Sequence, residues 1–293
     1  MVKLLPLCDG NDVPQLALRA FRSESTAQTK ATVKAFYAAG VRHFELAELF
    51  GNAHLVCEAL REVDALGGGG QRAGLYVTLK LWPKARKPED LIACCTTLLQ
   101  EVGLDYVDLL LIHAPIDLEN KADQWKAIED LKDAGVCRSI GVVNLSSAGL
   151  TDVLKNCRIT PVVHEMEVSP FHQRLDMTEF CSDSSMVVIN NEPLAKGLRH
   201  KSSPELQRIA AQCECTVDVL LLRYSAEKGF VVGIPEHCAA QLEGDAEAAL
   251  LHADRFNGRS LPGWAVQQLD ALEEAVGLSW VPVEPSPEEM DEE

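Results

Sequence analysis

The residues of this sequence that could carry chemistry fall at or just after the ends of short β-branched runs. They are carboxylates, a lysine, a histidine, two asparagines and one phenylalanine. The set comprises Glu45, Phe50, Lys80, His113, Asn144, Glu165, Asn191 and Glu236. In a closed parallel barrel the C-terminal ends of all strands meet at one face, where the active sites of such barrels lie. Taken singly, Lys80 would be a strand-end lysine that reaches water and His113 a buried, hydrogen-bonded histidine.

The elements that would position these residues alternate with a period of about thirty residues, which is typical of parallel βαβ units. Eight strands are expected near residues 15–20, 41–46, 74–80, 106–113, 137–143, 161–168, 186–191 and 230–234. Eight alternations around one core predict a closed (β/α)8 TIM barrel. The alternative fold is a doubly wound α/β sheet.

Helices are expected between the strands, and several should end on a glycine that can adopt positive φ. Their expected ranges are 28–39, 52–66, 88–102, 122–134, 147–156, 174–182 and 204–228, the last as a pair. Outside the alternation lie an N-terminal β-hairpin that turns at Asp9-Gly10 and an extra C-terminal helix over 263–275. We expect one barrel domain over residues 1–284 and an acidic tail over 285–293.

Composition narrows the function classes. The formal net charge of −17, from 44 acidic and 27 basic residues, repels phosphate backbones and anionic lipids, so neither nucleic acid nor a membrane is expected as a partner. Ten cysteines are spread over the chain without C-x-x-C spacing, and no H-E-x-x-H motif occurs. We therefore expect reduced thiols, a cytoplasmic protein and no metal site.

Several segments together resemble one family of reductases. They are G-V-R-H-F-E-L-A-E-L-F-G-N (40–52), V-T-L-K-L-W (77–82), L-D-Y-V-D-L-L-L-I-H (104–113), R-S-I-G-V-V-N (138–144), E-V-S-P-F (167–171) and P-L-A-K-G (193–197). In this order they resemble the aldo-keto reductases, from about residue 9 to 280. The resemblance implies a (β/α)8 barrel that binds extended NADPH and reduces carbonyls to alcohols.

The family's catalytic set, an aspartate, a tyrosine, a lysine and a histidine, is only half matched. Hydride delivered to a carbonyl carbon leaves an oxyanion that must be stabilised and protonated, and the tyrosine is the family's proton donor. Lys80 and His113 match the lysine and histidine, Glu45 stands for the aspartate, and Phe50 stands for the tyrosine. Loss of the hydroxyl removes acid catalysis worth about 10²- to 10⁴-fold.

The family's cofactor positions are also altered. Glu236 replaces the lysine that meets the 2′-phosphate, and a carboxylate about 4 Å from a phosphate costs about 4 kcal/mol per charge pair at an effective dielectric of 20. Glu165 replaces the glutamine that holds the carboxamide, and Asn191 replaces the ring that stacks on the nicotinamide. Asn144 keeps the family's identity. Glu236 alone would permit a change to NADH, because a carboxylate can accept a hydrogen bond from a ribose hydroxyl.

Two further substitutions lie near this site. Arg19 stands near the position at which the family has a glycine that gives the backbone room, and it would fill part of the pocket. Glu192 replaces a serine of the family. Glu165, Glu192 and Glu236 together form an acidic rim. The rim is either the product of drift after catalysis ended or a receptor for a cationic ligand or a basic protein partner.

We therefore expect a pseudoenzyme with a binding or regulatory role and no cofactor. The alternative is an active reductase of a small carbonyl, using NADPH or NADH, in which His113 and Lys80 handle the proton. Whether the chain is an enzyme is left open between these two.

Overall fold

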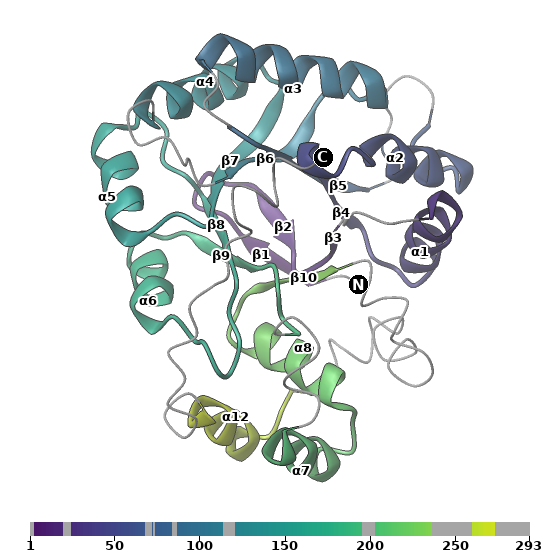
Figure 1. The fold of residues 1–293 in the computed structure, drawn as a ribbon, viewed down its shortest axis with the longest axis vertical. Coiled ribbons are helices and arrows are strands. Elements are labelled where there is room, and N and C mark those ends of the chain that lie inside the picture. Colours follow the sequence, from purple (N-terminus) through teal and green to yellow (C-terminus); the bar gives the residue numbers. More distant parts are fainter. Residues whose placement is uncertain are drawn as a thin grey trace.

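The core of the chain is a closed barrel of eight parallel strands. The computed structural model describes residues 3–19, 25–67, 72, 74–83, 87–113, 121–194, 203–235 and 260–272. Neighbouring strands follow the order β10-β3-β4-β5-β6-β7-β8-β9, and β10 closes the ring against β3. Helices surround this ring (Figure 1). The predicted TIM barrel is confirmed, and the doubly wound alternative is excluded because that sheet is open.

Each barrel strand lies within two residues of its expected bounds. The strands are β3 (Leu16–Arg19), β4 (His43–Ala47), β5 (Tyr76–Leu81), β6 (Val107–His113), β7 (Cys137–Val143), β8 (Val163–Met166), β9 (Val187–Asn190) and β10 (Val231–Pro235). Strands β8 and β9 are shorter than expected, because the apolar runs around them continue into loop residues that are not paired with a neighbouring strand.

Helices follow these strands, and several of them begin with a side-chain cap. They are α1 (Thr26–Ala38), α2 (Ala53–Glu62), α3 (Pro88–Val102), α4 (Lys121–Asp133), α5 (Ser147–Asn156), α6 (Leu175–Asp183), α7 (Pro204–Gln212), α8 (Val217–Glu227) and α12 (Gly263–Asp270). The side chains of Ser25, Ser146 and Thr216 accept hydrogen bonds from the first turns of α1, α5 and α8. Such caps satisfy amide groups that have no partner within the helix.

The expected end of the second helix at Leu66 was wrong. Helix α2 ends at Glu62, and the chain then turns through Asp64, which has a φ of 57°. The amide of Ala65 donates to the Leu60 carbonyl, so the last turn is closed by a left-handed residue. The apolar side chains of Ala65 and Leu66 are buried after the helix has ended, which is why their periodicity suggested a longer helix.

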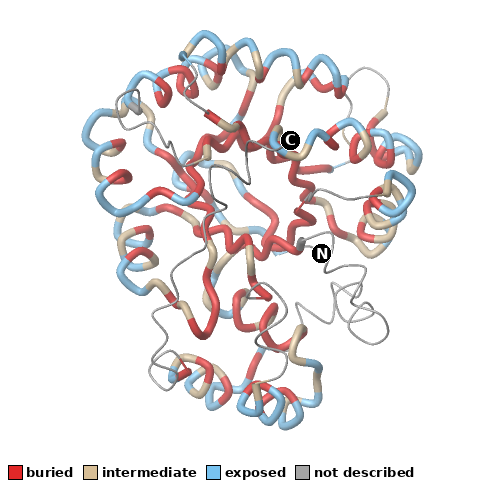
Figure 2. Tube along the Cα trace, viewed as in Figure 1, coloured by how far each residue is buried: buried red, intermediate tan, exposed pale blue. Residues whose placement is uncertain are grey.

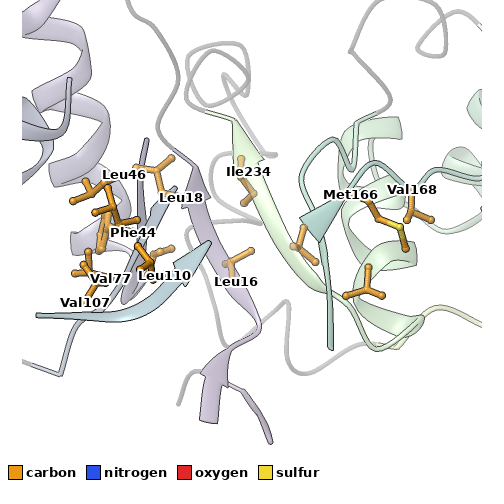
Figure 3. Packing of buried hydrophobic residues seen from close by; sticks show 14 of the residues in the cluster. Leu16, Leu18, Phe44, Leu46, Val77, Val107, Leu110, Met166, Val168 and Ile234 are labelled. Atoms are coloured by element: carbon orange, nitrogen blue, oxygen red, sulfur yellow. The ribbon is translucent and has the colours of Figure 1, made fainter. Parts of the chain in front are cut away.

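Alternating side chains along each strand supply two separate apolar layers. On β6, Leu110 and Ile112 point outward to the helices, while Leu109 and Leu111 point into the barrel. The outward layer includes Phe44, which Figure 3 shows with other members of this cluster such as Val77 and Leu110. The strands are therefore buried along their length, whereas the outer faces of the helices are exposed (Figure 2). Strands buried on both faces are typical of parallel sheets.

The N-terminal hairpin covers one end of the barrel. Strands β1 (Leu4–Pro6) and β2 (Asp12–Pro14) pair antiparallel, and Leu7 and Val13 join the apolar cluster inside the barrel. The Asp9 carboxylate accepts hydrogen bonds from Ser139 Oγ at 2.9 Å and Lys132 Nζ at 3.0 Å. The hairpin is therefore held to β7 and α4 at the end opposite to the candidate site.

Some of the expected features fall on residues outside the described ranges, and others concern membrane-spanning helices and disulfides. The acidic tail over 285–293, and Glu236 with it, lie outside the described residues. Among the described helices, none is long and apolar enough to cross a membrane. In the same part of the chain every cysteine is a free thiol.

The backbone of β7 makes a close approach that requires glycine. A Cβ built on Gly141 would lie 2.6 Å from the Val163 carbonyl oxygen and 2.8 Å from a Leu111 methyl group. We expect Gly141→Ala to lower the free energy of unfolding by about 1–3 kcal/mol, because overpacked cores shift backbone to relieve such clashes. Urea denaturation measures this change. Gly263→Ala, whose Cβ meets nothing within 4 Å, is the matched control and should change stability little; equal losses would contradict the prediction.

Candidate functional site

Strand alternation turns the candidate residues toward the same space at the C-terminal end of the barrel. Ala17 lies in the interior cluster, so Arg19, two residues later on β3, faces inward as well. On β4 and β5, Phe44 and Val77 pack outward, which turns Glu45 and Lys80 inward. Val163 is interior on β8, and Glu165 follows it on the same face. Four ionisable side chains from four strands thus meet at one mouth.

Lys80 is held between two carboxylates. Its Nζ lies 2.6 Å from Glu45 Oε1 and 2.9 Å from Glu165 Oε1. All three side chains are almost fully buried, with exposures of 8%, 2% and 0%. Two short ion pairs in a dry site orient the ammonium and leave it little freedom to act elsewhere.

Arg19 extends the same network toward β9. Its Nη1 donates to the Asn191 carbonyl and to Glu192 Oε1, the latter at 2.9 Å. Its Nε lies 3.6 Å from Glu45 Oε1. Burial opposes the positive charge, but the carboxylates of Glu192, Glu45 and Glu165 raise the pKa of the guanidinium above its ordinary value. Two cations therefore face three carboxylates.

The surplus carboxylate affects how protons are distributed. Burial, together with the charge of Glu165, raises the pKa of Glu45 to about 7. Burial also opposes ionisation of Glu165, but Lys80 and Arg19 outweigh it and lower the pKa of that carboxyl group. Like charges that share a site separate in this way, with one carboxyl group retaining its proton longer than the other. Glu165 is accordingly the permanent anion of the pair.

His113 lies beside this network at the end of β6. Burial and the positive charge of Lys80 lower its pKa to about 4, so the imidazole is neutral at pH 7. Its ring stacks on Trp82 with centroids 4.5 Å apart and planes inclined by 56°. The Nδ1 atom is buried without a hydrogen-bond partner among the described residues. A neutral imidazole can donate one hydrogen bond but carries no spare proton.

Phe50 lies on a short 3₁₀ helix, η1 (Glu48–Phe50), directly after β4. The helix packs against β5 and is joined to it because Glu48 Oε2 accepts a hydrogen bond from the Trp82 amide at 2.9 Å. The Phe50 side chain is partly buried. Its ring provides apolar surface on the segment in which the resemblance expects a hydroxyl group.

The remaining candidate residues are placed unevenly. Asn191 Nδ2 donates to Glu165 Oε1 at 3.1 Å, which joins it to the network. Asn144 has a left-handed backbone with φ 55°, and its amide donates to the Glu165 carbonyl at 2.8 Å, but its side chain is exposed. Glu236 follows β10 and lies outside the described residues.

Of two further buried histidines, His43 was not identified from the sequence, and the resemblance placed His164 only as the neighbour of Glu165. His43 Nε2 lies 2.8 Å from Thr78 Oγ1, inside the barrel below Glu45. His164 points the opposite way from Glu165, and its Nδ1 lies 3.5 Å from Cys181 Sγ on α6. Strand alternation could have placed both histidines. His43 lies two positions before the inward Glu45 and so faces inward, whereas His164 is adjacent to the inward Glu165 and so faces outward. Trp82 was likewise missed, although it closes the V-T-L-K-L-W segment.

Comparisons with known proteins identify the family and agree with the barrel fold. Residues 18–235 match the model of the aldo/keto reductase family. An aldo/keto reductase of Synechocystis is 29% identical over 78% of this chain and 79% of its own length. The crystal structure of an aldo/keto reductase from Brucella melitensis is 28% identical with a TM-score of 0.80, covering 93% of this chain and 100% of that one. The structure of a Bombyx mori aldo-keto reductase in complex with NADP is 25% identical, with a TM-score of 0.79 and 93% coverage of both chains.

The buried histidines predict acid-sensitive stability. Burial lowers the pKa of His43, His113 and His164 to about 4, against about 6.5 in an unfolded chain. Between these two pKa values the unfolded state therefore binds more protons than the folded state. The contribution of the neutral histidines to the free energy of unfolding is complete above pH 6.5 and is lost as the pH falls toward 4. Each histidine accounts for up to about 3 kcal/mol. Glu45, whose pKa is raised, acts in the opposite direction below pH 7 and offsets part of the loss.

His164→Asn tests this linkage. The variant should reduce the slope of unfolding free energy against pH by up to about 1.4 kcal/mol per pH unit between pH 6.5 and 4, which corresponds to one proton. Urea unfolding at several pH values measures the slope. Cys181→Ala keeps the imidazole buried and should retain the wild-type slope. An unchanged slope in His164→Asn would show that this imidazole does not couple to folding.

Proposed function

Since the chain belongs to the aldo/keto reductase family, we propose that it is a pseudoenzyme that has lost carbonyl reduction and retains its barrel for binding or regulation. The observation that carries this proposal is that Lys80 is held by two buried ion pairs, one with Glu45 and one with Glu165. In the family's chemistry the lysine assists a tyrosine hydroxyl, yet Phe50 has none, and Glu45 and Glu165 both bind the ammonium. The lysine thus serves a buried salt bridge, and Phe50 offers no hydroxyl group for it to assist.

The described residues do not fit a nicotinamide cofactor. Glu165 would have to receive a carboxamide, but its Oε1 already accepts hydrogen bonds from Lys80 and Asn191. Asn191 offers no ring face for stacking, and its carbonyl is occupied by Arg19. A neutral carboxamide group that entered this buried site would break charge-assisted hydrogen bonds without replacing them by equally strong ones.

The alternative function is active NADPH- or NADH-dependent reduction with His113 and Lys80 as the proton-handling pair. Its support is the retention of these two residues and the membership of a family whose relatives bear reductase names. Against it stands the pKa of about 4 for His113, because an imidazole that is neutral at pH 7 is a poor general acid.

The binding role that we propose concerns the acidic rim. Glu192 is its partly exposed member, with 16% of its side chain accessible, and it already pairs with Arg19. A cationic ligand or a basic segment of a protein partner would compete with Arg19 for this carboxylate. Charge reversal by Glu192→Lys should weaken the binding of such a partner, and a partner whose affinity it left unchanged would not use the rim.

We expect the wild-type protein to bind neither NADPH nor NADH and to reduce no small aldehyde. Fluorescence titration with each cofactor, up to about 1 mM at the top of the usual KM range, and a turnover assay measure this. Phe50→Tyr should yield no activity, because the hydroxyl would return to a site in which Lys80 is engaged by two carboxylates.

The aldo/keto reductase of Synechocystis, assayed in parallel, provides the positive control. Saturable binding of either cofactor with turnover by the wild-type chain would establish the alternative function. Activity in Phe50→Tyr alone would show that the hydroxyl was the single loss.

A further inference from the structure

The side chain of Arg19 crosses the barrel mouth above a neighbouring strand. Arg19 ends β3, and its guanidinium reaches Asn191 and Glu192 just after β9. Strand β10 lies between β3 and β9 in the sheet. Gly233 of β10 has no side chain to obstruct this path, and Arg19 Cδ lies 3.9 Å from the position that a Cβ on Gly233 would take.

The arginine is held at several points along its length. Nε lies 3.6 Å from Glu45 Oε1, and Nη1 donates to Glu192 Oε1 at 2.9 Å and to the Asn191 carbonyl. Only 10% of the side chain is exposed. An arginine bound to several acceptors in a buried site is costly to displace, since Glu192 Oε1 and the Asn191 carbonyl would lose this donor.

We propose that Arg19 is a built-in occupant of the side of the mouth between β3 and β9, and that Arg19, Glu165 and Glu192 exclude a dinucleotide as one interdependent set. This deepens the proposed function and rests on it. The charges explain the interdependence. Removing Arg19 alone leaves Lys80 to balance three carboxylates, whereas removing Glu192 alone leaves the guanidinium in place on Glu45 and Asn191. Joint replacement of all three empties the path and leaves Lys80 paired with Glu45.

The test compares Arg19→Gly, Glu192→Ser and Glu165→Gln, singly and combined. NADH is the probe, because it lacks the 2′-phosphate that the Glu236 carboxylate would repel. We expect no saturable binding by the wild type or the single variants. The triple variant should bind NADH at least roughly tenfold more tightly than the wild type and each single variant. A tenfold change in affinity corresponds to about 1.4 kcal/mol.

Stability without any cofactor gives a second readout. We expect Arg19→Gly to lower the melting temperature and the addition of Glu192→Ser to restore part of the loss, because the second change removes a carboxylate that the first left unpaired. Arg158→Gly is the control variant. Arg158 pairs with Asp133 through an exposed contact, so its loss should alter neither NADH binding nor the response to Glu192→Ser.

The outcomes separate the two proposals. Tight NADH binding with turnover by the wild type would overturn the proposed function. With an inert wild type, the inference on Arg19 is overturned if a folded triple variant gains no NADH binding. It is also overturned if Arg19→Gly alone binds as well as the triple variant, or if the Arg19 and Glu192 melting shifts simply add.

Discussion

Five ionisable side chains meet at the mouth of this barrel with at most 16% of any one exposed, and the pairing of their opposite charges is the constraint on which the mouth depends. Isolated charges would be too costly to bury there. Lys80 joins Glu45 to Glu165, and Arg19 joins Glu45 to Glu192. These contacts link β3, β4, β5 and β8 with the segment after β9, so the ends of distant strands are fixed relative to one another by charge as well as by the sheet.

The apolar layers determine where these charges can lie. Period-two alternation assigns Phe44 and Val77 to the outer layer, and by the same geometry it assigns Glu45 and Lys80 to the inside. Lower in the barrel the interior is filled by residues such as Leu109, Leu111 and Val163. The charged level is thus the uppermost layer of a packed interior of the kind that this barrel family builds.

Much of the fold could be predicted from the sequence, because strand alternation, glycine-ended helices and the barrel period are local signals. The bounds of α3, β7 and α5 were predicted to the residue. The end of α2 was not, since a left-handed Asp64 is hard to recognise among helix-forming neighbours. Within the site, the resemblance pointed to Glu45, Lys80 and His113, but it could not reveal that Glu165 shares Lys80. That pairing depends on strand stagger across the barrel, which joins residues 85 positions apart.

The hairpin at the other end of the barrel has a consequence for the order of folding during synthesis. It is translated early, yet its polar anchor is Ser139, 130 residues beyond Asp9. Its apolar residues also pack with Leu109, Leu111 and Val163, which likewise emerge from the ribosome long after the hairpin. The hairpin therefore stays solvated until more than half of the barrel has been made. Contacts so distant in sequence close slowly, which makes docking of the hairpin a late step and its apolar face a surface that the nascent chain has to keep from aggregating.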